Sequence, residues 1–163
     1  MTFDGEDLLD SVEAMIKGGI SAKLTAIEAE KIAKGKGVSG GLPVPEASAY
    51  TRQTWSNNIL NHSPAIFYGI ENVQAEGVGP ATMEKFTVFV EVVMVDSGMD
   101  TDTSSRIMRY SRALKEIFQE GFAEVAETGR IKIETVRPVS FKLDQDSSEE
   151  IKVGGVSLTV ALA

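Results

Sequence analysis

The sequence predicts an α+β domain, with a four-stranded, largely antiparallel sheet in α-β-β-α-β-β order and helices packed on it. Three patterns indicate this class. Residues 84–95, EKFTVFVEVVMV, are apolar at alternate positions and carry further apolar residues between them, which is typical of a central strand. Residues 106–125 have apolar positions three or four apart, as in a helix lying on a sheet. Alternating strand patterns then follow in 130–143 and 151–162.

The composition limits the class of protein to which the chain can belong. The 163 residues, 42% of them hydrophobic, fit one domain spanning 1–163. We expect a protein without a membrane span or signal peptide, because no apolar run approaches about 20 residues. The chain has no cysteine, which excludes disulfides and thiolate metal sites. Its net charge of −8 argues against tight nucleic-acid binding, although DNA passing nearby without specific contact is compatible with it.

The first element is a predicted helix over about 4–34. An apolar stripe recurs at helical spacing and consists of Leu8, Val12, Met15, Ile16, Ile20, Leu24 and Ile27. Gly18-Gly19 interrupts the pattern, and a kink, a break between two helices or a close contact would each explain the pair. We favour one helix with a weak point.

Residues 35–63 are predicted to form a long arm. The glycines and prolines of GKGVSGGLPVP end the helix. The arm exceeds the roughly 15 residues beyond which an unstructured connection is unusual in a compact domain. Residues 46–60 contain Tyr50 and the only tryptophan, Trp55, and a short helix and an extended segment both fit them. Packing on the chain's own sheet and packing on a neighbouring subunit both remain open.

The sheet and second helix are assigned to residues 64–163. Residues 64–70 alternate as a first strand, and a glycine- and proline-rich loop over 74–83 is predicted to join it to 84–95 as an antiparallel hairpin. After the helix, Gly129 is predicted to lie just beyond a helix end. Pro138 cannot donate to a ladder, so its half of the strand belongs at an edge or a bulge.

Residues 144–150 read as a polar tip before the closing strand. Gly154-Gly155 lies inside that strand pattern. A two-residue hairpin turn fits the pair, and so does a bulge that switches the side-chain parity between Val153 and Val156.

No catalytic or metal-binding set emerges from the residues. Asp96, Asp100 and Asp102 are close in sequence, but their spacing fails the pattern of an EF-hand calcium loop. Capping of the following helix by Asp102 and its neighbours explains them better. The sole histidine, His62, stands in the arm without a nucleophile motif. We therefore expect no enzyme activity, no metal and no cofactor.

Two further patterns have ordinary explanations. GKG at 35–37 and GVG at 77–79 lack the rest of a phosphate-binding loop and are interpreted as flexible connections. Arg106, Arg109 and Arg112 recur every three residues and indicate a solvated helix face, with a rim of ion pairs between subunits as the second interpretation.

Taken together, the layout resembles the tail terminator and tail-completion proteins of tailed bacteriophages, and more loosely the neck proteins that join head to tail. The resemblance covers nearly the whole chain and rests on these stretches: the N-terminal helix, the connection with LPVP, the strand beginning PAIF, the strand 86–95, the loop DSGMDTD, the helix SSRIMRYSRALKEIF and the closing GVSLTV. The chain is somewhat longer than the smallest members, with the excess in the N-terminal helix and the arm.

The resemblance implies a structural, non-enzymatic virion protein made in the host cytoplasm. Such proteins form a ring, usually hexameric, that caps the tail tube and offers a surface to the head. The expected partners are further copies of the chain, the tail tube protein and a head-closure or connector protein. A head-closure or other neck connector role is the alternative within the family. An alternative of a different class is a small α+β ligand-binding or regulatory domain with an apolar pocket between sheet and helix.

Interface residues cannot be transferred by motif, so they are selected from the expected exposure of loops and of the second helix. A closed ring needs two different patches that meet head to tail. The candidates are Tyr50, Trp55, Gly77, Gly79, Met83, Arg106, Arg109, Asp144 and Asp146.

Overall fold

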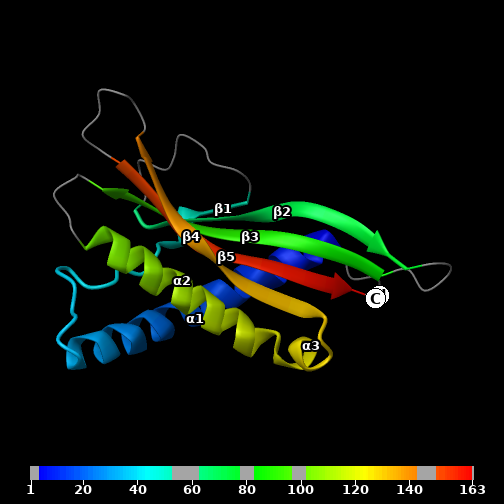
Figure 1. Ribbon diagram of the computed structural model, residues 1–163, viewed down its shortest axis with the longest axis horizontal. Helices are drawn as coiled ribbons and strands as arrows, with labels where there is room; N and C mark the ends of the chain where they lie inside the picture. Colours follow the sequence, from blue (N-terminus) through cyan, green and yellow to red (C-terminus); the bar gives the residue numbers. More distant parts are fainter. Residues whose placement is uncertain (1–3, 53–62, 78–82, 97–101, 143–149, 163) are drawn as a thin grey trace.

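A computed structural model describes residues 4–52, 63–77, 83–96, 102–142 and 150–162. A five-stranded sheet forms one layer, and two long helices cover one of its faces (Figure 1). The elements in chain order are α1 (Gly5–Ala33), a 3-10 turn (Ala47–Ala49), β1 (Tyr50–Arg52), β2 (Ala65–Glu76), β3 (Met83–Asp96), α2 (Thr103–Gly121), α3 (Ala123–Glu127), β4 (Ile131–Lys142) and β5 (Glu150–Leu162). The α+β class is therefore confirmed.

The sheet differs from the prediction in the number and direction of its strands. Its order is β1-β2-β3-β5-β4, and β1 pairs parallel to β2, so a mixed five-stranded sheet replaces the predicted four-stranded, largely antiparallel one. The extra strand comes from the arm and has three residues, too few for alternation to reveal it. The other four strands pair antiparallel.

The β2–β3 hairpin is longer than predicted. Strand β2 continues to Glu76, which pairs with Met83 at the start of β3. The predicted loop over 74–83 is therefore wrong at both ends. Gln74 and Ala75 are poor strand formers, but the adjacent strand supplies backbone partners that local propensity does not record.

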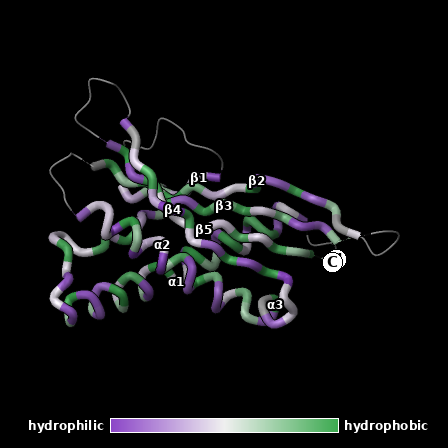
Figure 2. The backbone as a smooth tube through the Cα atoms, viewed as in Figure 1, coloured by the Kyte–Doolittle hydropathy of each residue, from purple (hydrophilic) through white to green (hydrophobic). Residues whose placement is uncertain are grey.

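The central strands are apolar on both faces because both faces are buried at one end. On the helix side, Val88, Val90 and Val92 join the main core with the stripe of α1 and the apolar face of α2. On the opposite side a smaller cluster consists of Ala65, Phe67, Val93, Ile151 and Val153, with Phe89 packed against it. Figure 2 shows hydrophobic positions running along the central strands and alternating with hydrophilic ones along the helices.

Helix α1 passes through Gly18-Gly19 without a break, as favoured from the sequence. Asp4 begins it with a capping box, in which the Asp4 carboxylate accepts from the amides of Glu6 and Asp7. A Cβ on Gly19 would lie 3.2 Å from Ile117 Cγ1 of α2. The second glycine therefore marks a close helix–helix contact, whereas the first meets nothing within 4 Å.

Both predicted roles for Gly154-Gly155 are wrong. The pair lies inside the continuous strand β5, in unbroken register with β3. A Cβ on Gly154 would lie 2.5 Å from Ile107 Cγ2 and 3.0 Å from Ser111 Oγ, so the glycine lets α2 approach the sheet. The register shift falls instead on the edge strand β4, between Val136 and Val139, where Pro138 was expected to require an edge or a bulge.

Gly18, where an added Cβ would meet nothing within 4 Å, and Gly154, which lies against α2, give a matched test of stability. Gly18→Ala is expected to raise the free energy of unfolding by about 0.5–1 kcal/mol, because it removes backbone entropy at an exposed helix position without a clash. Gly154→Ala is expected to lower it by about 1–3 kcal/mol through overpacking against α2. Urea unfolding of both variants measures the difference, and equal stabilities would contradict the close α2–β5 contact.

Candidate functional site

Two arginines of α2 hold the beginning of the arm. Arg106 donates from Nε to the Gly41 carbonyl at 3.2 Å and from Nη2 to the Ser39 carbonyl. Arg109 donates from Nη2 to the Lys36 carbonyl at 2.6 Å. Both arginines are only 8% exposed. The predicted solvated face is therefore wrong for these two residues, which bond to arm carbonyls, while Nη1 of Arg109 is buried without a hydrogen-bond partner among the described residues.

Two other α2 contacts secure the same segment. The Tyr110 hydroxyl donates to the Pro43 carbonyl, and burial raises the pKa of Tyr110 well above its usual value. Asp102 precedes α2 as predicted, but its carboxylate accepts from the Ser39 amide at 3.2 Å and makes no cap bond. The predicted capping role of the Asp102 side chain is wrong because the arm supplies a competing donor.

The next part of the arm is held by α1 through an ionic cluster. Arg52 of β1 donates to Asp10, to Glu13 Oε2 at 3.3 Å and to the Tyr68 hydroxyl at 3.4 Å. Glu13 also accepts from Lys17 Nζ at 2.7 Å. The bond from Lys17, with further donation from Tyr68 and Arg52, lowers the pKa of Glu13 to about 2.

Tyr50, a candidate interface residue, packs on its own chain. The Lys17 ammonium lies 5.0 Å from the Tyr50 ring centre, and the side chain is half-buried against the main core. Burial raises its pKa to about 12. As far as residue 52, the arm thus follows the first of the two packing options, while Trp55 lies outside the described residues.

The remaining candidates are dispersed. Gly77 is exposed at the end of β2, with a φ of 127° that favours glycine, and Met83 begins β3. Gly79, Asp144 and Asp146 lie outside the described residues. The candidates that are described do not form one patch, because Arg106 and Arg109 face the arm. Their part in an interface stays a prediction.

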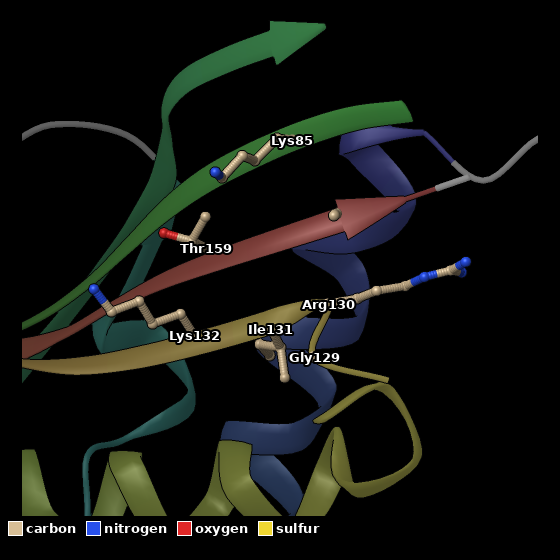
Figure 3. A pocket seen from close by; sticks show the side chains of 7 residues that line it. Lys85, Gly129, Arg130, Ile131, Lys132 and Thr159 are labelled. Carbon is tan, nitrogen blue, oxygen red and sulfur yellow. The ribbon is translucent and has the colours of Figure 1, made fainter. Parts of the chain in front are cut away.

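A shallow hollow of about 260 Å³ lies near the end of β5 (Figure 3). It is lined by Lys85, Gly129, Arg130, Ile131, Lys132, Thr159 and Ala161. Lys85 and Lys132 extend on the Thr159 side, whereas Arg130 extends the opposite way. The ammonium group of Lys132 also pairs with Glu134 at 2.7 Å. The cations therefore do not converge on one point.

This hollow is not the pocket expected of a ligand-binding domain. Such pockets are usually about 300–1,000 Å³, enclosed and mostly apolar. The space between sheet and helices, where that alternative places its ligand, is filled by core side chains such as Val88, Leu114 and Leu158. We therefore assign the hollow to the contour of the sheet.

The described residues contain no group of three or more His, Asp or Glu side chains placed to hold a metal ion. Within the same ranges, no helix has both the length and the hydrophobicity needed to cross a bilayer. His62, Asp100 and the side chain of Asp96 lie outside the described set. A scan against protein-family models and a search of curated proteins return no significant match for this chain.

Sequence reasoning left the attachment of the arm open and missed the contacts that make it. The usable signal for β1 was the run Asp10, Glu13 and Lys17, which puts charges on one side of α1 opposite Arg52. No signal pointed to carbonyl groups as the partners of Arg106 and Arg109, because backbone acceptors have no sequence signature.

Replacing the two buried arginines is expected to release the arm. The double variant Arg106→Ala, Arg109→Ala should speed tryptic cleavage after Lys36 by at least about tenfold, since lost charged hydrogen bonds cost roughly 1.5–3 kcal/mol each. Arg112→Ala is the matched control, because Arg112 pairs with Glu30 and Glu116 instead. Equal cleavage in both variants would contradict the assigned role.

The ionic cluster predicts a pH dependence. The pKa of Glu13 is about 2 in the folded chain against 4.5 ordinarily, so its ionised form stabilises the fold above pH 4.5 and this contribution is lost as pH falls toward 2. The stability difference between wild type and Glu13→Gln should therefore be present at pH 7 and vanish near pH 2. Urea unfolding across that range measures it, with Glu124→Gln on exposed α3 as the control. A difference independent of pH would refute the cluster.

Proposed function

We propose that this protein is a structural virion component, a tail terminator that forms a ring at the head-proximal end of a phage tail tube. In that position it stops polymerisation of the tube and offers the joining surface for the head. The observation that carries the proposal is the layout. A long N-terminal helix is followed by a β-hairpin, a second long helix and two closing strands, with both helices on one face of the sheet. This is the order on which the resemblance to tail terminators rests.

The surfaces of the molecule are compatible with such a role. The helix layer is buried against one face of the sheet. Apart from the buried cluster around Phe67 and Ile151, the opposite face and the outer strands are open to neighbours among the described residues. Its proposed partners are further copies of the chain, the tail tube protein and a head-closure or connector protein. The net charge of −8 suits a conduit through which DNA passes without being held. A head-closure role uses the same ring at a different junction and is the alternative.

Assembly state tests the proposal. The full chain is expected to form a closed ring of about six copies in native mass spectrometry over a concentration series, with a central hole in negative-stain images. Tail tubes assembled without this protein should stop growing when it is added and should carry one ring at one end. Tubes that elongate equally with and without it would refute the terminator role. A ring that binds the head portal and ignores tubes would favour head closure.

A further inference from the structure

The sheet has two outer edges without a partner among the described strands. Strand β4 is outermost on one side. On the other side β1 covers β2 only from Ile66 to Tyr68, which leaves residues 69–76 as an uncovered segment, called here the β2 edge. The β2 edge is exposed over 71–75, and β4 is exposed over most of its length. Uncovered strands of this length are templates for pairing with another chain.

The backbone of β4 presents hydrogen-bonding groups outward at known positions. The Ala161 amide donates to the Arg130 carbonyl at 2.8 Å, so these two residues form a hydrogen-bonded pair. Antiparallel partners alternate between bonded and non-bonded pairs. Ile131, Ile133 and Thr135 therefore point their N–H and C=O groups away from β5.

The same alternation can be carried across the sheet to β2. Through the registers of β5 and β3, Asn72 and Gln74 exchange bonds with β3. Val73 and Ala75 consequently point their backbone groups outward at the β2 edge. Both edges thus offer donors and acceptors at alternate residues, on β2 from Asn72 onward, because a register shift falls between Ile70 and Asn72.

The two edges lie level with each other and run in opposite directions. One row across the sheet reads Val73, Phe86, Val160 and Ile131, all on the helix side. A copy placed beside the first without a shift would bring Ile131 next to the neighbour's Val73, which is 49% exposed. Because β4 is antiparallel to β5 and β2 is antiparallel to β3, the new pair would also be antiparallel.

Charge distinguishes the pairing of β4 with the β2 edge from the pairing of two identical edges. Strand β4 contains Lys132, Arg137 and Lys142 against Glu134, whereas the β2 edge contains Glu71 and Glu76 and no basic residue. Two β2 edges would bring only acidic residues together. In the mixed pair the first residues of β4 face the β2 edge, so that Lys132 lies opposite Asn72 and next to Glu71, whereas Arg137 and Lys142 lie beyond it. Contacts between two different patches generate rings or filaments, whereas symmetric contacts stop at a dimer.

We propose that β4 of one copy pairs antiparallel with the β2 edge of the next copy, so that one continuous sheet runs through the assembly. The occupant of each edge is a second copy of this chain. This inference rests on the proposed ring and specifies the contact that closes it. The ladder supplies main-chain hydrogen bonds, and the opposite charges fix which edge meets which.

A proline at an outward-facing amide tests the ladder. Val73→Pro removes one donor that the β2–β3 ladder does not use, and Val73 is 49% exposed. The association constant measured by native mass spectrometry and sedimentation is expected to fall at least about tenfold. Val73→Thr keeps the amide and is expected to stay within about twofold of wild type. Equal association of the two variants, with both folded by circular dichroism, would overturn the pairing.

Cross-linking tests which edges meet. The chain has no cysteine, so single cysteines can be placed at Asn72 and Lys132, the exposed ends of one row on the outer face. A short bifunctional maleimide should join Asn72→Cys protein to Lys132→Cys protein in a mixture and should join neither to itself. Efficient cross-linking of Lys132→Cys protein alone would show a symmetric β4 contact and overturn the proposal.

The outcomes separate this inference from the function. A ring that persists in Val73→Pro would contradict the edge pairing and leave the terminator role intact. A wild-type chain that stays monomeric at the highest concentration, yet stops tube growth, would likewise contradict the edge pairing and leave the terminator role intact. If mixed cross-links form but the assembly has no effect on tubes, the edge pairing is supported and the terminator role is contradicted.

Discussion

Helix α2 lies close against the sheet because Gly154 has no side chain where Ile107 and Ser111 meet β5. Any Cβ at that position would overlap Ile107, and the interior is packed too densely to absorb the overlap without cost. Gly155 next to it has a φ of 138°, and a side chain there would run into the Val90 carbonyl of β3. Gly154 thus sets the separation between α2 and the sheet, and Gly155 permits the close approach of β5 to β3.

The remaining elements take their positions from α2. One side of this helix packs on α1, where Gly19 meets Ile117 and where Arg112 pairs with Glu30 at 2.7 Å. Its first two turns face the arm and bind the arm's carbonyls through Arg106 and other side chains. Charged donors are well suited to this task, since they satisfy several acceptors from one partly buried position. A displaced α2 would therefore disturb the core, α1 and the arm together.

The outer strands of the sheet, which α1 and α2 do not cover, are relevant to the proposed assembly. Natural sheets usually protect long edges with charges, prolines or bulges, and β4 has all three. Its basic residues, Pro138 and the register shift near Val136 would disfavour pairing with an identical strand. The first half of β4, from Ile131 to Thr135, keeps regular register and open backbone groups. The same strand can thus resist symmetric aggregation and still accept a different, acidic edge.

The sequence by itself determined the elements in which buried side chains recur at a regular spacing. The stripe of α1, the two-sided apolar β3, the alternation of β5 and the edge position of Pro138 all follow from the period of their side chains. The tertiary structure decided the rest: that β1 joins the sheet, that Arg106 and Arg109 bind carbonyls, and that Gly154 faces α2. The physical reason is that each of these contacts joins residues distant in sequence through backbone groups or through the absence of a side chain. Neither leaves a periodic signal, and both become apparent only when the layers are packed.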